Sequence, residues 1–449
     1  MIISNYGSNN LSKNVIIKGT LILTIAGILT KLLGFYNRIF LTRIIGVKEL
    51  GIYQLIFPIY ILSISFCCQG ISTAITKHVS YHLGKGNKGN SLYIFKYGLC
   101  ISLSLSIIAM LLIYSLSTPI SIHILKNSDC GRLLRIICVA LPFVAIKSCI
   151  NSYFIGSDRP DILGISHFME QLIRIVTAYI LAYAVSNPTF DSRLATLSVV
   201  SGEIFSSILA VILIWKSGKG IQSSSKLNKV NIISFVQDVI PITTNNLIFT
   251  LFASFEAIIL PAMLYKFYAD SNTSMELYGM VTGIVIPFLL FPATITTSLS
   301  TMLLPAISNA KAHNNKKKIK KAIISCCSFS IFLGLIAFAG YSILGEWACE
   351  FAFKSKNAGV LLNRMSFLCP FIYVNGILST ILNGLDKAFN NLFINILGLI
   401  IRILFTYILV PVYGINAYVL GMFLSYLLMI CLMLMGISST VSKDSLQAS

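Results

Sequence analysis

Cations at helical spacing in the first long apolar segment are the residues of this sequence best placed to do chemistry. Lys31 and Arg38 lie two helical turns apart, so they share one face of a helix. Arg43 follows near the outer end of the segment. A charge near the centre of a membrane helix costs about 2.5–3.5 kcal/mol on insertion scales, so a carboxylate, a water-filled cavity or an anionic ligand must compensate Lys31. Small or polar residues complete this face, which we call the basic stripe: Thr20, Thr24, Gly27, Lys31, Gly34, Arg38 and Thr42.

A complementary pattern occurs in the apolar segment 233–265. Asp238, Asn245 and Glu256 are spaced so that they share one helix face, which we call the acidic stripe. Two interpretations stay open. The two stripes can pair and neutralise each other, as intramembrane charges usually do. Alternatively, the cations hold a phosphate or pyrophosphate through charge-assisted hydrogen bonds, while the acidic stripe binds a coupling cation or locks one state of a transport cycle.

The remaining charges inside apolar segments are predicted to serve packing. Glu170 lies one turn before Arg174 and can pair with it along the helix. Lys147, in the middle of its segment, is expected to face a partner or a cavity, and Glu203 is expected to pair in the same way on another helix.

The pair Lys77 and His78 ends the second segment and is expected to extend toward the inner interface rather than to bind substrate. The five histidines show no metal-ligand spacing, and no catalytic constellation stands out, so neither a metal site nor an enzyme is expected. Most of the eleven cysteines lie in apolar runs and are predicted to be small buried residues. Cys130 and Cys349 are predicted to lie in loops, where they could pair.

Composition places the chain in the membrane. Of its 449 residues, 56% are hydrophobic and 11% are charged, whereas soluble domains carry about 25% charged residues. Apolar runs of membrane-spanning length recur throughout, which predicts an all-α polytopic membrane protein. The net charge of +19 is explained by Lys and Arg in short inner loops, so no nucleic-acid partner is expected. This distribution predicts a cell-membrane protein with both termini in the cytoplasm.

Twelve spans are predicted between residues 15 and 436, divided six and six by a Gly/Ser/Lys-rich segment. The expected organisation is an N-terminal lobe (1–216), a cytoplasmic linker (217–232), a C-terminal lobe (233–436) and a cytoplasmic tail (437–449).

Residue matches at a constant spacing of 228 relate the two halves: Pro142-Phe143 with Pro370-Phe371, Gly156-x-Asp158-Arg159 with Gly384-x-Asp386-Lys387, Arg174 with Arg402, and Gly51 with Gly279. An even number of spans in each half predicts a parallel repeat around a central cavity. In the two repeated loops, the glycine is expected to end one helix and the aspartate to cap the next.

Two stretches carry a family resemblance: KGTLILTIAGILTKLLGFYNRIFLTRIIGVKELGIYQLIFPIY (18–60) and PFLLFPATITTSLSTMLLPAISNA (287–310). They resemble the stage V sporulation protein B and polysaccharide flippase family, part of the multidrug/oligosaccharidyl-lipid/polysaccharide superfamily that includes the lipid II flippase. The resemblance implies two six-helix lobes around a cavity. Lys31 and Arg43 match positions implied to contact the lipid diphosphate, and Arg38 is displaced by one residue from another. The segment around Ile61–Ile64 is apolar where the lipid II branch has an arginine pair, and many relatives have fourteen spans.

The expected function is therefore a transporter that flips lipid-linked sugar or peptidoglycan precursors by alternating access, for the cell wall or spore cortex. Lys31, Arg38 and Arg43 would bind the substrate phosphate, and Asp238, Asn245 and Glu256 would serve coupling or gating. No cofactor is expected beyond a coupling ion, Na⁺ or H⁺. The expected partners are the lipid-linked sugar diphosphate, membrane lipids and cell-wall synthases. The alternatives are a cation-coupled multidrug exporter of the same superfamily and a non-transporting membrane scaffold for wall synthesis.

Overall fold

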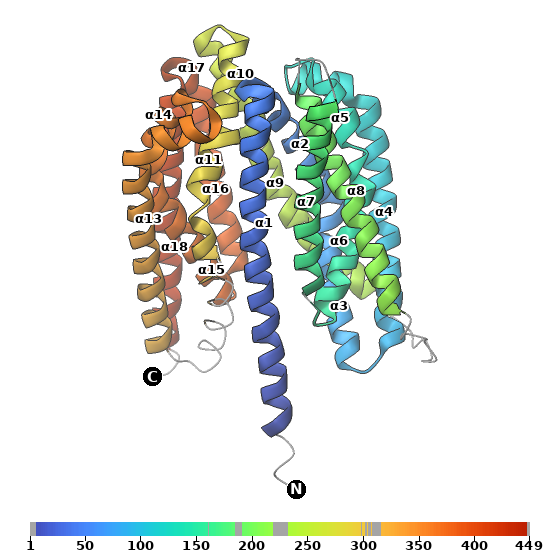
Figure 1. Cartoon of the computed structure of the whole chain (residues 1–449). Helices are drawn as coiled ribbons and strands as arrows, with labels where there is room; N and C mark the ends of the chain where they lie inside the picture. The colour runs from blue at the N-terminus through green and yellow to red at the C-terminus, as the bar shows by residue number, and fades with distance from the viewer. Residues whose placement is uncertain are drawn as a thin grey trace. The chain divides into compact units, whose positions relative to one another are not determined.

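A computed structural model describes residues 6–159, 161–184, 191–218, 232–297, 299–300, 303, 307 and 316–446 (Figure 1). Within these ranges the chain is helical and contains no strand. The all-α prediction is confirmed. Side chains are described from Gly27 onward, so Thr20 and Thr24 of the basic stripe lie outside the described side chains.

The first half of the chain forms long helices with two short π-helical segments. Its elements are α1 (Tyr6–Leu55), α2 (Phe57–Ile64), η1 (Ser65–Gln69), α3 (Gly70–Gly84), α4 (Lys88–Pro119), η2 (Ile120–Ile124), α5 (Cys130–Ile137), α6 (Ala140–Gly156), α7 (Asp161–Ala184) and α8 (Ser192–Gly218). Gly46 interrupts α1 with a left-handed backbone (φ 80°, ψ 168°), a conformation that glycine adopts at little cost.

The second half has a similar succession of elements. They are α9 (Ile232–Tyr268), α10 (Ser271–Gly279), η3 (Met280–Val285), α11 (Ile286–Leu290), α13 (Lys316–Phe353), α14 (Lys356–Met365), η4 (Ser366–Leu368), α15 (Cys369–Gly384), α16 (Ala388–Ile408), α17 (Val410–Tyr413) and α18 (Ile415–Leu446).

Nine helices in the described part of the chain are long and apolar enough to cross a membrane, or ten if the bent pair α5 and α6 is one span. One of the nine, Gly27–Gly84, has 58 residues. At about 1.5 Å per residue this stretch is far longer than one crossing of a core about 30 Å thick, and it contains the break at Gly46. The predicted number of twelve spans stays a prediction.

The chain divides into two compact units: unit 1 comprises residues 1–45 and 55–250, and unit 2 comprises residues 46–54 and 251–449. Each unit therefore includes a segment that the chain order would assign to the other half. Residues 46–54 belong to unit 2, and the first half of α9 belongs to unit 1. Most of the predicted linker (217–232) lies outside the described residues, and the predicted lobe boundaries stay predictions.

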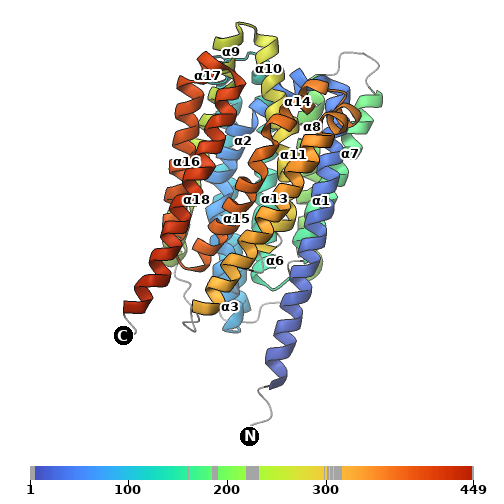
Figure 2. The same ribbon diagram turned by 90° about the vertical axis from the view of Figure 1, so that its left-hand side faces the viewer.

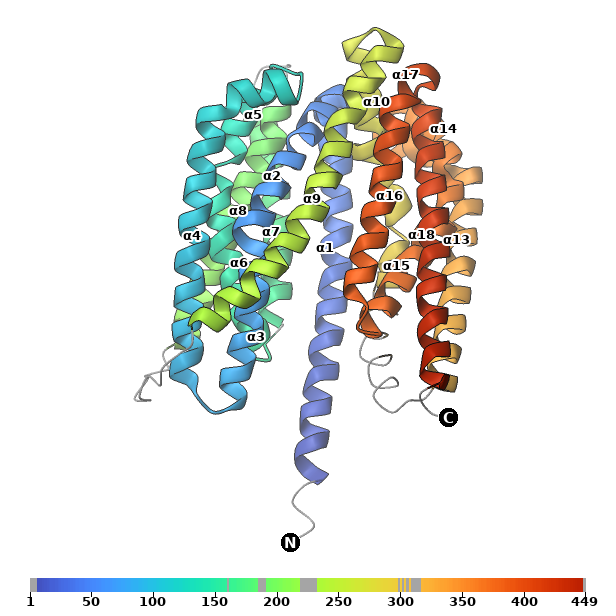
Figure 3. The same ribbon diagram turned by 180° about the vertical axis from the view of Figure 1, so that it is seen from behind.

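The core of unit 1 packs α3, α4 and α6 around the beginning of α9. Phe235 of α9 is 1% exposed, in a buried cluster with Ile71, Ile75 and Phe95. Its ring meets the His78 ring edge-on, with centroids 5.5 Å apart. Figure 3 shows this part of α9 lying beside α3.

The core of unit 2 packs α13, α15, α16 and α18, whose ribbons lie side by side in Figure 2. Ile377 and Ile381 of α15 are fully buried, in one cluster with Met429 and Met433 of α18. Small residues allow close helix approach here: a Cβ built on Gly398 of α16 would lie 2.0 Å from the Met429 sulfur.

The internal repeat is visible in backbone detail. Asp158 and Asp386 adopt matching left-handed conformations, with φ 57° and 59°. The next amide bonds back into the preceding helix at 2.9 Å in both loops, from Arg159 to Phe154 and from Lys387 to Leu382. The predicted roles in these loops were wrong in part. Each glycine ends its helix as predicted, α6 at Gly156 and α15 at Gly384. The aspartate does not cap the helix after the second loop, because the N-cap of α16 is Lys387, with no side-chain cap bond.

Gly51 and Gly279, also related by the repeat, contact each other inside unit 2. A Cβ on Gly51 would lie 2.3 Å from the Met275 carbonyl oxygen, and one on Gly279 would lie 2.3 Å from the Val47 carbonyl oxygen. Val47 and Met275 are themselves 228 residues apart. The contact is therefore reciprocal, as at a two-fold axis, and only glycine fits on either side.

Candidate functional site

The basic stripe lies on α1, which packs against α7 within unit 1. A Cβ on Gly34 would lie 3.7 Å from Oε1 of Gln171. Further toward the C-terminal ends of the same two helices, the Tyr36 and Tyr179 hydroxyl oxygens are 2.5 Å apart. The Phe40 ring stacks on the Tyr179 ring, with centroids 3.8 Å apart. The contacts advance together along both helices, so α1 and α7 run in parallel. Gly34 of the stripe thus faces protein, whereas nothing lies within 4 Å of a Cβ on Gly27.

The three predicted phosphate ligands follow this helix in order. Lys31 and Arg43 are exposed and Arg38 is partly buried. The Thr42 hydroxyl donates to the Arg38 carbonyl oxygen at 2.8 Å, a bond that uses the polar atom of Thr42 within the helix. The three cations thus lie on one helix, with two of the three side chains exposed.

The acidic stripe is divided between the two units. Asp238 and Asn245 belong to unit 1, and Glu256 belongs to unit 2. Asp238 accepts hydrogen bonds from Lys77 at 2.8 Å and faces Nε2 of His78 at 2.8 Å. The prediction that Lys77 and His78 extend toward the interface was incomplete, because both contact this carboxylate. Asn245 is exposed.

Glu256 lies in a different electrostatic setting. It is 5% exposed, and its Oε2 lies 2.8 Å from the Arg402 guanidinium. The Tyr418 hydroxyl donates to its Oε1 at 3.4 Å, and the Arg402 guanidinium lies 5.9 Å from the centre of the Tyr426 ring. These residues border a cavity of about 230 Å³ in unit 2, whose other walls are mostly apolar. Arg402, which repeats Arg174, is therefore a partly buried ion-pair partner within its own unit.

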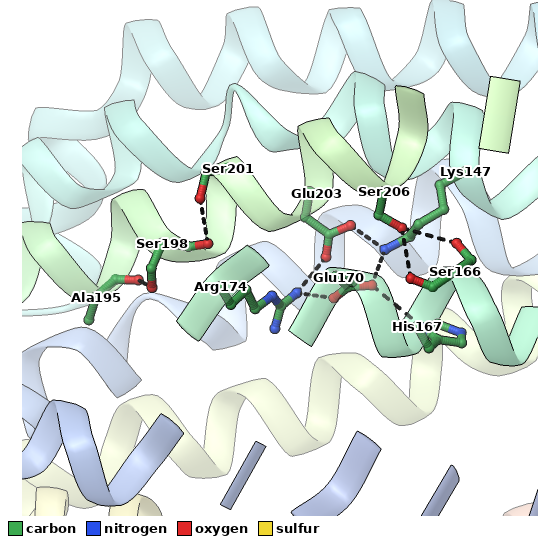
Figure 4. Close-up of polar contacts among 10 residues, drawn as sticks. All are labelled: Lys147, Ser166, His167, Glu170, Arg174, Ala195, Ser198, Ser201, Glu203 and Ser206. Carbon is green, nitrogen blue, oxygen red and sulfur yellow. Dashed lines mark hydrogen bonds and ion pairs between the residues drawn. The ribbon is translucent and has the colours of Figure 1, made fainter. Parts of the chain in front are cut away.

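Unit 1 contains a closed group of four charges, three buried and one partly buried (Arg174), which we call the buried ring: Lys147, Glu170, Arg174 and Glu203 (Figure 4). Lys147 of α6 donates to Glu170 of α7 at 2.7 Å and also contacts Glu203 of α8. Arg174 contacts Glu170 on its own helix and lies 2.7 Å from Glu203. The predicted pairing of Glu170 with Arg174 is confirmed, and Lys147 has the partners that its position predicts. Two cations and two carboxylates thus balance and join three helices.

A glycine makes room for this group. A Cβ on Gly202 of α8 would lie 2.5 Å from Cγ of Arg174 and 3.2 Å from the Glu170 carbonyl oxygen. Because α8 can approach α7 so closely here, the neighbouring Glu203 reaches both cations. Buried charges are tolerated only when such partners surround them.

All eleven cysteines lie in the described part of the chain, and all are free thiols. The predicted loop positions of Cys130 and Cys349 were wrong, because both are buried in helices, α5 and α13. Among the described residues, no group of three or more His, Cys, Asp or Glu side chains is arranged to hold a metal ion.

Residues 16–311, about two thirds of the chain, match the family model described as polysaccharide biosynthesis protein. The chain belongs to this family. Two relatives from Bacillus subtilis (strain 168) are similar over most of its length. Stage V sporulation protein B is 26% identical over 403 residues, which cover 87% of this chain and 77% of the relative. Lipid II flippase MurJ is 22% identical over 453 residues, which cover 92% of this chain and 80% of the relative.

Solved transporter structures share the fold of this chain. An inward-facing multidrug resistance MATE family transporter of the MOP superfamily aligns with a TM-score of 0.69 at 13% identity, over 96% of this chain and 99% of that chain. A second match is a MOP superfamily transporter from Pyrococcus furiosus, whose binding pocket is described as reversed in polarity. It aligns with a TM-score of 0.65 at 15% identity, over 95% of this chain and 96% of that chain. At these identities the likeness establishes the fold alone.

The structure adds contacts that the sequence pattern did not predict. Arg402 and Tyr418 meet Glu256, and Lys77 with His78 meets Asp238. No spacing rule links residues so far apart in the chain. The strongest available signal was the rarity of cations in apolar segments, since each of them needs a carboxylate or a cavity.

Proposed function

We propose that this protein is a non-enzymatic transporter that flips lipid-linked sugar or peptidoglycan precursors across the cytoplasmic membrane by alternating access. The observation that carries the proposal is a helix with accessible cations, α1, in a chain whose relatives include a lipid II flippase. The proposal includes service to the cell wall or spore cortex, both termini in the cytoplasm, and cell-wall synthases as partners.

In this proposal Lys31, Arg38 and Arg43 hold the phosphate or diphosphate of the lipid carrier. Charge-assisted hydrogen bonds to phosphate oxygens are among the strongest polar contacts. Arginine suits phosphate because its planar fork can bond two oxygens at once, whereas lysine acts as a point charge. The spacing of the three side chains along α1 lets an anion pass from one cation to the next while it moves along the helix axis.

Asp238, Asn245 and Glu256 serve coupling or gating in the proposal, with Na⁺ or H⁺ as the ion. Both carboxylates are engaged with cationic side chains, Asp238 with Lys77 and Glu256 with Arg402. A coupling ion would therefore act by competing with these partners and would release them when it binds. Each carboxylate would thus alternate between two arrangements, one paired with its cationic side chain and one bound to the coupling ion. A gate requires two such states.

The test replaces Lys31 and Arg38 together by Ala and measures flipping of a lipid-linked precursor in reconstituted vesicles. Loss of flipping at unchanged expression is expected, because the substrate charge would then be unpaired in the membrane. The matched control is Lys96→Ala with Arg132→Ala, which removes the same two charge types from exposed positions on α4 and α5. Normal flipping by the Lys31/Arg38 variant would refute the phosphate site.

Two other functions remain as alternatives. Multidrug export is favoured by one observation, the carboxylate of Glu256 with Tyr418 and Tyr426 at a cavity, a combination that suits organic cations. Arg402 already neutralises that carboxylate, which counts against it. A scaffold for wall synthases would tolerate Lys31→Met with Arg38→Met without loss of wall synthesis, whereas a transporter would not.

A further inference from the structure

A second polar surface borders the basic stripe, on the face of α7 that carries His167 and Gln171. We infer that these two side chains bind the sugar next to the phosphate of the transported lipid. The inference rests on the proposed function, because it extends the phosphate site on α1 to a neighbouring helix. It assigns a binding role to residues that no pattern in the sequence points to.

The register of the two helices places these residues beside the cations. Gly34 of α1 is level with Gln171 of α7, with 3.7 Å between the built Cβ and Oε1. The helices run in parallel, as the stacking of Phe40 on Tyr179 further along shows. Lys31 lies about one turn before Gly34, and His167 lies about one turn before Gln171, so these two residues occupy the same level.

The chemistry of the two surfaces differs in a way that fits a sugar phosphate. Lys31 supplies positive charge, which a phosphate needs. Gln171 supplies an amide that both donates and accepts hydrogen bonds, and the imidazole of His167 adds one further polar atom, Nε2. Hydroxyl and acetamido groups of a sugar need such donors and acceptors. A cation and two further polar groups within about one helical turn of one another therefore suit a ligand that is anionic at one end and polyhydroxylated at the other.

His167 is accessible for such a role. Its side chain is 47% exposed, and its Nδ1 lies 3.5 Å from Oε2 of Glu170. The contact on Nδ1 leaves Nε2 as the nitrogen for a ligand. Gln171 is partly exposed. Both side chains thus combine a fixed position with a free polar edge.

The buried ring anchors this turn of α7 to two neighbouring helices. Glu170 and Arg174 lie in the same two turns as His167 and Gln171, and they are joined to α6 and α8 through Lys147 and Glu203. A binding surface gains affinity when its supporting residues are rigid before the ligand arrives. This gives the ring a supporting role in recognition in addition to its structural one.

The experiment measures binding of two probes to the full chain in lipid nanodiscs by calorimetry. One probe is farnesyl diphosphate, and the other is farnesyl diphosphate linked to N-acetylglucosamine. Gln171→Ala and His167→Ala should each weaken binding of the sugar-bearing probe about 3- to 10-fold, the value of one or two hydrogen bonds, and should leave binding of farnesyl diphosphate unchanged. Lys31→Ala should weaken binding of both probes.

Controls separate this role from folding and from the proposed function. Gln237→Ala and His123→Ala remove the same side chains at other exposed positions of unit 1 and should bind both probes normally. Gln171→Met keeps the side-chain volume, so it should behave as Gln171→Ala does if the amide binds the sugar. Equal weakening of both probes, no weakening, or a wild-type protein that gains nothing from the sugar would overturn the inference. Normal binding of both probes by Lys31→Ala would instead refute the phosphate site.

Discussion

At the scale of single residues, the intramembrane charges whose partners the structure describes form compact neutral or near-neutral groups. The buried ring contains two cations and two carboxylates, and the group in unit 2 contains Glu256 and Arg402. Bringing an ion out of water costs several kcal/mol, and only good geometry with opposite charges recovers it. Removing one member should therefore be more damaging than removing a matched pair.

Lys147→Met tests this rule in the buried ring. The variant leaves Glu170 and Glu203 with Arg174 as their one partner within the ring, so we expect a loss of about 3–5 kcal/mol in the free energy of unfolding. The measurement is a denaturant or detergent unfolding titration of the purified chain. Lys147→Met combined with Glu203→Gln restores one positive and one negative charge, and it should recover much of the loss. An equal or larger loss in the double variant would contradict the charge-balance explanation.

The sequence predicts such groups only when the partners are close along the chain. Glu170 and Arg174 are one turn apart on one helix, so their pairing follows from helix geometry alone. Glu256 and Arg402 lie on α9 and α16, and their contact depends on how helices pack within unit 2. The candidate site follows the same division. The stripe on α1 could be predicted from spacing, whereas its packing on α7 could not.

At the scale of elements, α10 begins with a well-formed cap outside the membrane-spanning segments. Asp270 accepts hydrogen bonds from the Thr273 hydroxyl at 2.6 Å, from the Thr273 amide at 2.9 Å and from the Asn272 amide at 3.2 Å. These bonds, the Thr273 hydroxyl first, hold the pKa of Asp270 below its ordinary value. They favour the charged carboxylate and satisfy amides that the helix leaves open.

This cap predicts a pH dependence for the start of α10. A carboxyl group whose pKa is lower in the folded state stabilises the fold above the unfolded pKa of about 3.9, and the effect is lost as pH falls through the folded pKa. Hydrogen exchange at the Asn272 and Thr273 amides should therefore be slow near neutral pH and should lose its protection in acid, after correction for intrinsic rates. Asp270→Asn should remove that pH dependence. Unchanged pH dependence in Asp270→Asn would show that another group is responsible.

The repeated elements were the most predictable part of the fold, because matched glycine, aspartate and proline positions recur with one spacing. The details within them were less predictable. Gly156 ends its helix as predicted, but the close packing around it was not foreseen: a Cβ there would lie 2.9 Å from the Thr76 carbonyl oxygen. A sequence shows that a glycine is needed without showing whether space or backbone conformation requires it.

At the scale of the whole molecule, the two units exchange short segments of chain. The beginning of α9 completes unit 1, where Phe235 fills the core and Asp238 meets Lys77 and His78. Residues 46–54 complete unit 2, where Leu50 is 1% exposed and packs on Gly283. Sequence composition favours a boundary between the units at the polar linker. It does not show that α9, which follows the linker, begins by packing on the unit that precedes it.

The exchange predicts how the chain behaves when it is cut in the linker. The fragment 1–216 lacks the segment 232–250 of unit 1, so Lys77 and His78 lose their carboxylate and the core loses Phe235. Inside a membrane, packing and polar contacts rather than water exclusion hold helices together, so these losses are not offset by lipid. We expect the fragment 1–216 to be degraded when expressed alone and to be recovered as a complex when 217–449 is co-expressed. The fragment 1–250, which retains the missing segment, should accumulate to a higher level than 1–216, as measured by immunoblot and by retention in mild detergent. Equal accumulation of 1–216 and 1–250, with no effect of co-expression, would mean that the beginning of α9 contributes little to unit 1.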